Sequence, residues 1–186
     1  MRLFLAGVVP EAVKQTLHTQ LAPVRAATPQ ARWLPADTLH LTLVFLGAVP
    51  DASVLPLQAA FGGVCGRHHA VHLTLGGVET FGPTRSPRVL ATTLAGDVEG
   101  LHALITEARH AAEPLVPLEP ERAFRPHLTV ARARSAHGDV LLGRCRAALV
   151  QVLDGAFELR EVALMKSDTL PGGAVHTVLA RWTLPG

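Results

Sequence analysis

HLTLVFLG (residues 40–47) and HLTVAR (residues 127–132) are two apolar segments that begin with the same three residues. Side chains alternate between the two faces of a β-strand, so the histidine and threonine of each copy should point the same way. Two such strands side by side would present two imidazoles and two hydroxyls to one cleft. These groups suit phosphodiester chemistry, because one histidine can accept a proton, the other can donate one, and hydroxyls can hold phosphate oxygens.

The same tripeptide occurs a third time, at residues 72–74. A histidine two residues before a threonine also arises by chance about once in a chain of this composition. Context separates the copies, because His40 and His127 lead apolar runs whereas His72 runs into Gly76-Gly77. We therefore take His40 and His127 as the functional pair and expect His72 to be a polar residue on a half-exposed strand.

The composition is that of an ordinary folded domain. The chain has 186 residues, of which 48% are hydrophobic, so it can form one domain or two small lobes that share a core. A formal net charge of +2 excludes a polycation. Six arginines nevertheless gather around the second motif, where they would attract a nucleic-acid backbone unless they are merely scattered, solvated side chains. They are Arg122, Arg125, Arg132, Arg134, Arg144 and Arg146.

The cysteines and the apolar runs indicate the compartment. Cys65 and Cys145 stand alone, without CxxC spacing, which is typical of free thiols in a reducing environment. No apolar run approaches the length of a membrane span. The apolar residues 3–9 are followed at once by Pro10-Glu11, so they resemble a first strand more than a signal peptide. These features predict a soluble, cytoplasmic protein that does not associate with membranes.

Hydrophobic periodicity predicts alternating strands and helices. Strands are expected over residues 2–9, 40–46, 71–75, 88–94, 127–131, 158–165 and 175–184, helices over 10–21, 52–61, 97–112 and 139–153, and a glycine- and proline-rich connection over 76–87. The order of elements that starts at His40 starts again at His127, with a circular shift. This internal repeat predicts an α+β fold that is bilobal and pseudo-two-fold, with two antiparallel sheets lining a central groove and helices outside. Residues 1–186 would form a single domain of two pseudo-symmetric lobes.

The same segments carry a family resemblance that extends over essentially the whole chain. Residues 1–10, 33–47 and 124–132 resemble the RNA 2′,3′-cyclic phosphodiesterase family, also named 2′-5′ RNA ligases, of the two-histidine (2H) phosphoesterase superfamily. Residues 87–90, 164–167 and 174–178 extend the resemblance. It implies a hydrolase that opens terminal cyclic phosphates of RNA to 2′-phosphates, with reversible 2′-5′ RNA ligation as a possible second activity. No metal or other cofactor is expected, and we expect a monomer whose partner is an RNA end or a related nucleotide.

Roles follow for the motif residues. We assign His127 as the base and His40 as the acid in hydrolysis, with the roles exchanged in the reverse direction; the sequence leaves the opposite assignment open. Thr42 and Thr129 would hydrogen-bond the non-bridging phosphate oxygens. Arg132 would face away from His127 on a regular strand, so it can contact the phosphate only if the strand ends or bulges; the resemblance favours such a phosphate role.

Three residues are candidates for stacking on a base. Members of the family often carry an aromatic residue, commonly Tyr, where this chain has His176, and this chain contains no Tyr. An imidazole at this position could still stack on a base. Phe45 and Phe124 are the other candidates, although we expect core packing to be the main use of each.

Three other interpretations stay open. Residues 166–168 partly match the nucleophile motif of ATP-dependent ligases, with Thr169 where that motif has glycine. His68, His69 and His72 have a spacing that could hold a metal, although no cysteine or carboxylate lies near them in the sequence. A non-catalytic module that binds RNA ends or nucleotides would keep basic and aromatic contacts but would not need both histidines.

Overall fold

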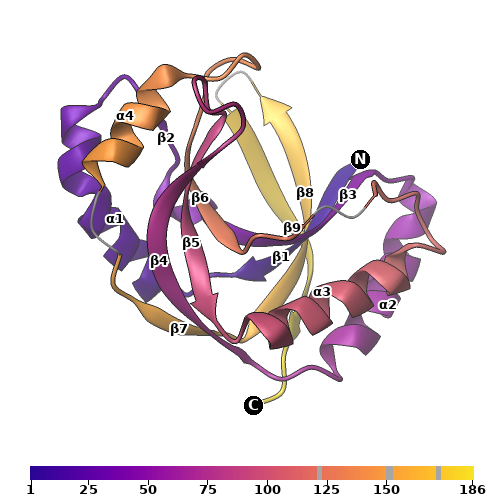
Figure 1. Ribbon diagram of the computed structural model, residues 1–186. Helices are drawn as coiled ribbons and strands as arrows, with labels where there is room; N and C mark the ends of the chain where they lie inside the picture. The colour runs from indigo at the N-terminus through magenta and orange to yellow at the C-terminus, as the bar shows by residue number, and fades with distance from the viewer. Residues whose placement is uncertain (121–122, 150–152, 171–172) are drawn as a thin grey trace.

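The structure, a computed structural model, describes residues 1–186 except 121–122, 150–152 and 171–172 (Figure 1). Its strands are β1 (Arg2–Val8), β2 (Arg32–Trp33), β3 (His40–Ala48), β4 (Val71–Phe81), β5 (Val89–Gly96), β6 (His127–Arg132), β7 (Ala156–Leu159), β8 (Glu161–Leu170) and β9 (Gly173–Thr183). Its α-helices are α1 (Glu11–Ala27), α2 (Val54–Cys65), α3 (Val98–Ala112) and α4 (Val140–Ala148). Single 3-10 turns, η1 (Ala36–Thr38) and η2 (Asp51–Ser53), precede β3 and α2.

The strand order is symmetric about the two motif strands. It runs β7-β4-β5-β6-β3-β1-β8-β9, and the short β2 pairs with β6. In the centre, β6 and β3 run antiparallel and meet at Leu41 and Leu128, the middle residues of the two HLT tripeptides. A two-fold axis through this residue pair would exchange the two halves of the strand order, as the internal repeat predicts.

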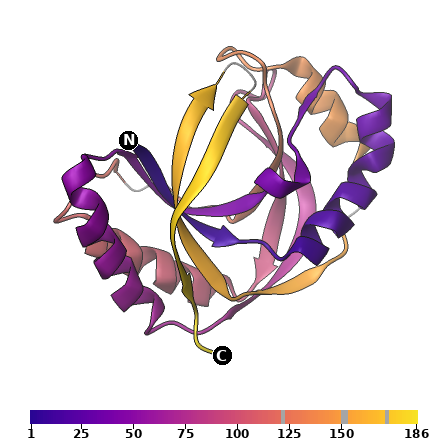
Figure 2. The ribbon, with the colours of Figure 1, turned by 180° about the vertical axis from the view of Figure 1, so that it is seen from behind.

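The structure corrects the expectation of two antiparallel sheets. All nine strands of the described residues belong to one continuous, strongly curled sheet, because β3 and β6 join the two halves (Figures 1 and 2). Two separate sheets would each leave a motif strand as an open edge with unpaired backbone groups. The pairing of Leu41 with Leu128 joins these two edges at the HLT tripeptides.

The helices lie outside the sheet, one pair on each half (Figures 1 and 2). On one half α2 and α3 pack together and contact β9 and β3, while on the other half α4 contacts β4 and β5. The predicted apolar stripe of α3 is confirmed, since Leu101, Leu104 and Ile105 are buried. This helix begins after Asp97, whose carboxylate accepts a hydrogen bond from the Gly100 backbone N–H. Among the described residues, no helix is both long enough and apolar enough to cross a membrane.

Several element boundaries differ from the sequence-based expectations. Helix α1 continues past its internal Pro23 to Ala27, and the expected strand over 158–165 is divided between β7 and β8. The last part of the helix expected over 139–153 falls on residues outside the described ranges, and α4 itself ends at Ala148. The short strand β2 was not predicted, because two residues carry no periodic signal.

The glycine-rich segment after Leu75 is part of a strand and not a loop. Strand β4 continues to Phe81, and its register with β5 shifts between Leu75 and Val78. A β-bulge therefore absorbs one of the two glycines. A side chain at Gly76 would collide with the hydroxyl of Thr93 on β5, which explains the glycine at this point. The longer strand carries Phe81 to the centre of the sheet.

Candidate active site

The two motif strands bring the predicted histidines and threonines onto one face of the sheet. Leu41 opposes Leu128, and antiparallel strands set neighbouring residues against each other in reverse order, so His40 lies beside Thr129 and Thr42 beside His127. All four side chains are half-buried, while the leucines between them are buried in the core. We call these four residues the motif patch; its histidines occupy diagonal positions.

A β-bulge in β3 extends this face to Phe45. Ala6 pairs with Thr42 and Phe4 pairs with Phe45, so β3 advances by three residues where β1 advances by two. Because Phe4 and Ala6 share a face, Phe45 shares the face of Thr42. Its side chain is 68% exposed, and its ring centroid lies 6.4 Å from that of Phe4. The expectation that Phe45 packs in the core is therefore wrong, whereas Phe124 does pack against the core.

A matching bulge in β6 brings Arg132 to the same face. Ala91 pairs with Thr129 and Val89 pairs with Arg132, so Val130 is the extra residue. The condition for a phosphate contact by Arg132 is thus met, because the bulge turns its side chain to the face of His127. The two bulges occur at the same offset from the two histidines, so Phe45 and Arg132 are counterparts in the internal repeat.

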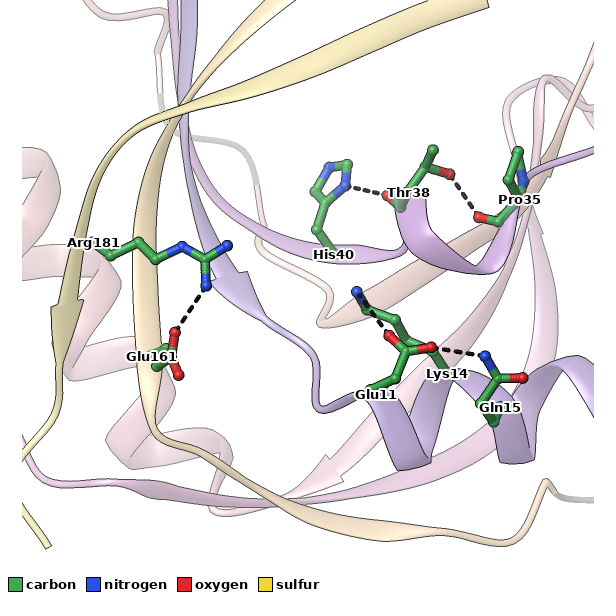
Figure 3. Close-up of polar contacts among 8 residues, drawn as sticks. All are labelled: Glu11, Lys14, Gln15, Pro35, Thr38, His40, Glu161 and Arg181. Atoms are coloured by element: carbon green, nitrogen blue, oxygen red, sulfur yellow. Dashed lines mark hydrogen bonds and ion pairs between the residues drawn. The ribbon is translucent and has the colours of Figure 1, made fainter.

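Backbone carbonyls fix the tautomer of both histidines. His40 Nδ1 lies 2.8 Å from the carbonyl oxygen of Thr38 (Figure 3), and His127 Nδ1 lies 2.7 Å from that of Arg125. A carbonyl oxygen only accepts, so each Nδ1 carries a hydrogen and donates it. Each neutral ring then has its free lone pair on Nε2 and can take up a proton there. Both contacts reach back two residues along the chain.

A phenylalanine ring supports each of these imidazoles. The Phe4 and His40 centroids are 4.9 Å apart with the planes tilted by 36°, and the Phe81 and His127 centroids are 4.6 Å apart with a tilt of 33°. The Arg125 guanidinium also lies over the Phe81 ring, with its central carbon 4.9 Å from the ring centroid. Sequence reasoning missed both rings. Phe81 fell in an expected loop, and its contact with His127 becomes visible only in the folded structure.

His176 on β9 adds a third imidazole. Its ring centroid lies 5.1 Å from that of His40, with the planes at 84°, and 5.0 Å from that of Phe4. Its Nδ1 is buried and has no hydrogen-bond partner among the described residues. The predicted stacking residue is therefore next to the motif patch, with its ring edge against the first histidine.

Burial and positive neighbours lower the pKa of the groups around His40. Burial is the main cause that lowers the pKa of His40 from its ordinary 6.5 to about 4; the Thr38 carbonyl opposes it, and the charges of His176 and Arg132 add to it. Burial also lowers the pKa of His176, with a further contribution from Arg132. His40 is thus neutral at pH 7 in the free protein.

The side chain of Arg132 is partly exposed to solvent, but the neighbouring strands shield part of its guanidinium from water. This desolvation lowers the pKa of Arg132, and the nearby charge of Arg32 adds a smaller effect. An arginine nevertheless keeps its charge at neutral pH. The site therefore combines neutral imidazole with a permanent cation, a combination that suits binding of an anion.

Comparison with known proteins gives the same answer as the motifs. A family model described as LigT like Phosphoesterase matches residues 8–91. An RNA 2′,3′-cyclic phosphodiesterase of Thermus thermophilus is 32% identical over 197 residues, which cover 100% of this chain and 91% of the relative. The chain belongs to the LigT-like phosphoesterase family. An RNA 2′,3′-cyclic phosphodiesterase of Escherichia coli is 28% identical over 188 residues, covering 98% of this chain and 96% of the relative.

Solved structures of LigT-like phosphoesterases have the same fold. The crystal structure of a Thermus thermophilus protein matches 100% of this chain and 99% of its own length with a TM-score of 0.82 and 25% identity. Escherichia coli LigT in complex with 3′-AMP matches 98% and 97%, with a TM-score of 0.75 and 28% identity. The predicted family and the mixed α and β class with helices outside are confirmed.

The residues of the alternative metal-site and ligase-motif interpretations lie away from the motif patch in this LigT-like phosphoesterase. His72 on β4 is 77% exposed in its side chain and lies 3.1 Å from a carboxylate oxygen of Glu158. His68 contacts Glu107 instead, and the described residues contain no group of three or more ligands that could hold a metal ion. Lys166, of the partial ligase motif, forms an ion pair of 2.8 Å with Asp168 on β8.

The five described arginines near the second motif point to different partners and elements. Arg125 pairs with Glu79, and Arg134 donates to the carbonyl oxygen of Gln30. Arg144 and Arg146 lie on the outer helix α4 (Figure 1). Arg122 lies outside the described residues. Arg132 is the member of this group whose side chain the strand register brings to the face of the motif patch.

Proposed function

We propose that this chain is an RNA 2′,3′-cyclic phosphodiesterase that opens terminal cyclic phosphates to 2′-phosphates by acid–base catalysis. The observation that carries the proposal is the motif patch, in which two histidines on opposed strands both keep Nε2 free while Nδ1 is bound to backbone. The names of the relatives support the same reaction. RNA ends with a cyclic phosphate arise during RNA cleavage and processing, so RNA is the partner we expect.

In this mechanism His40 and His127 act on opposite sides of the phosphorus atom. His127 Nε2 takes a proton from the attacking water as the new P–O bond forms, and His40 gives a proton to the sugar 3′ oxygen as the P–O3′ bond breaks. The phosphate stays on the 2′ oxygen. In ligation a 5′-hydroxyl takes the place of the water, so His127 accepts its proton and His40 again protonates the departing 3′ oxygen. The two roles are exchanged in the reverse direction, in which the 3′-hydroxyl attacks the 2′-5′ linkage and re-forms the cyclic phosphate. We include reversible ligation in the proposal.

The remaining polar groups would stabilise the charge that develops on phosphorus. Thr42 and Thr129 donate hydroxyl hydrogen bonds to the two non-bridging oxygens, since each lies beside the histidine of the other strand. Arg132 adds a guanidinium whose forked N–H groups suit phosphate. The negative phosphate also opposes the effects that lower the pKa of His40, so we propose that substrate binding protonates this acid.

Two rings are available for the nucleobase. We propose that Phe45 stacks on the terminal base, because it is exposed on the face of the motif patch and is not needed in the core. His176 would form a second contact, since its ring already borders His40.

We further propose that residues 1–186 act as one domain with two pseudo-symmetric lobes, supported by the symmetric strand order. A monomer suffices, because one chain supplies both histidines. A cytoplasmic location is consistent with the free thiols of Cys65 and Cys145, both buried in the core.

The test is incubation with a short RNA that ends in a 2′,3′-cyclic phosphate, followed by identification of the terminal phosphate isomer. We expect a 2′-phosphate, formed at the same rate with and without EDTA, because two imidazoles take the place of a metal-activated water. Loss of activity in EDTA that zinc or magnesium restores would overturn the two-histidine mechanism. Tight binding of the RNA without any product would favour a non-catalytic RNA-end module.

A further inference from the structure

Arg32 lies directly beside Arg132 across two paired strands. Strand β2 runs antiparallel to β6, and Arg32 is the register partner of Arg132, so both side chains leave the sheet on the same face. Like charges in directly opposed positions destabilise a strand pair. Neither guanidinium has an ion pair or a side-chain hydrogen bond with any residue that the structure describes. Within the described residues, the two positive charges beside the motif patch thus have no compensating carboxylate.

The guanidinium of Arg32 lies outside the motif patch, against the first residue of β9. A Cβ atom on Gly173 would be 2.8 Å from Arg32 Nη2, so this guanidinium rests against the first residue of β9. Gly173 precedes His176 by three residues, a distance of about 10 Å along a strand. His176 in turn borders His40. We infer from this spacing that Arg32 does not hydrogen-bond a phosphate held between His40 and His127.

We propose that Arg32, together with Arg132, binds a second phosphate of the substrate, the phosphodiester that precedes the terminal nucleotide. This inference rests on the proposed function and specifies its substrate class: ends of RNA chains in preference to mononucleoside 2′,3′-cyclic phosphates. Guanidinium groups bind phosphate through paired N–H donors, and one phosphate between them removes the repulsion of the two charges. Arg132 lies between the two phosphate positions, whereas Arg32 serves only the second.

The strand register also gives the bound RNA a direction. Along the paired strands, the order is Arg32 beside Arg132, then the motif patch, then Phe45 on the continuation of β3. The arginine pair and the exposed ring thus lie at opposite ends of the patch. The terminal base lies toward Phe45, and the preceding nucleotides leave over Arg32.

Three substrates isolate the second phosphate. They are a nucleoside 2′,3′-cyclic phosphate, a dinucleotide ending in the same cyclic phosphate, and that dinucleotide with an uncharged methylphosphonate as its internal linkage. For the unchanged protein, we expect kcat/KM to be about tenfold or more higher for the charged dinucleotide than for the methylphosphonate, as for hydrogen bonds to a charged group. Arg32→Gln should remove this preference and leave turnover of the nucleoside cyclic phosphate unchanged.

Arg144→Gln is the matched control, because it removes the same charge from the outer helix α4. It should keep the preference for the charged dinucleotide. Equal rates of the unchanged protein on the two dinucleotides would overturn the second phosphate site. So would an Arg32→Gln variant that is slowed equally on all three substrates, because Arg32 would then serve the terminal phosphate or the fold.

Failure of the proposed function can be told apart from failure of this inference. If no cyclic phosphate is opened, the binding constants of the two dinucleotides, measured by competition against a labelled RNA end, replace the rates. Tighter binding of the charged dinucleotide that is lost in Arg32→Gln and kept in Arg144→Gln would support the second phosphate site without catalysis. Equal binding of the two dinucleotides would overturn it.

Discussion

A hydrogen bond at Nδ1 determines what each motif histidine can do. Because the carbonyl oxygens of Thr38 and Arg125 hold the two Nδ1–H groups, both rings offer only Nε2 to a ligand. The third tripeptide lacks this arrangement, since His72 is exposed and contacts Glu158 from the surface of β4. The residue-scale predictions follow from this difference.

We expect His40→Ala and His127→Ala each to lower the rate of cyclic-phosphate opening by about a hundredfold or more, because each removes one proton carrier. His72→Ala is the control and should stay close to the rate of the unchanged protein. Rates measured under single-turnover conditions separate this effect from substrate binding. A His72→Ala variant as slow as His40→Ala would show that the wrong tripeptide was chosen.

The titration of His40 should respond to the ligand. In the free protein the pKa of His40 is lowered to about 4 by burial and by positive neighbours. A bound nucleoside 2′-phosphate supplies negative charge and should raise this pKa by one unit or more. NMR of the imidazole signals across pH 3.5 to 8, with and without the ligand, measures both values. If the pKa of His40 does not rise, His40 is the base and the assignments of the two histidines must be exchanged.

At the scale of elements, β-bulges decide which residues reach the motif patch. The period of two in the sequence was sufficient to predict that His40 and Thr42 share a face, as do His127 and Thr129. It could not predict the faces of Phe45 and Arg132, because a bulge is set by pairing with β1 or β5 and leaves no local mark. Phe4 and Phe81 were missed for the same reason, since their contacts depend on strands distant in sequence.

The bulge in β4 can be tested with two adjacent glycines. Gly76→Ala places a Cβ against Thr93, so we expect a loss of about 1–3 kcal/mol in the free energy of unfolding. The catalytic rate should fall as well, because β4 carries Phe81 under His127. Gly77→Ala meets nothing within 4 Å and is the control. Urea unfolding curves give the stabilities; equal midpoints for the two variants would contradict the packing described for Gly76.

At the scale of the whole molecule, the internal repeat predicted the symmetric strand order but not its closure into one sheet. The repeat identifies two similar halves, and nothing in either half shows that β3 and β6 would meet at Leu41 and Leu128. That contact joins segments far apart in the chain, and its register depends on how both halves pack. Sequence periodicity therefore described each half better than the junction between them.

Stability should depend on pH because of the buried imidazoles. The unfolded chain binds a proton at His40 near pH 6.5, whereas the folded protein does so only near pH 4, so the unfolded state holds more protons in this window. The free energy of unfolding should therefore fall as the pH drops from 6.5 to 4, by about 3 kcal/mol at most from His40 alone. His176 acts in the same direction, because burial lowers its pKa as well.

Urea unfolding at pH 7, 5.5 and 4.5 measures this dependence. His40→Asn should flatten it, because asparagine has no proton to gain, while His72→Ala should leave it unchanged. A stability that rises on acidification, or an equal slope in His40→Asn, would mean that His40 is not buried in its neutral form.

The two-fold relation between the motif strands has a consequence for the regiochemistry of the reaction. His40 with Thr42 and His127 with Thr129 are equivalent under exchange of the two halves, so these four residues alone could open a cyclic phosphate toward either sugar oxygen. The choice of leaving oxygen must then come from residues without a counterpart of the same kind in the other half. Phe45 faces Arg132 across the patch, and His176 flanks only one imidazole. We therefore expect these asymmetric neighbours, and not the four motif residues, to determine which phosphate isomer is formed.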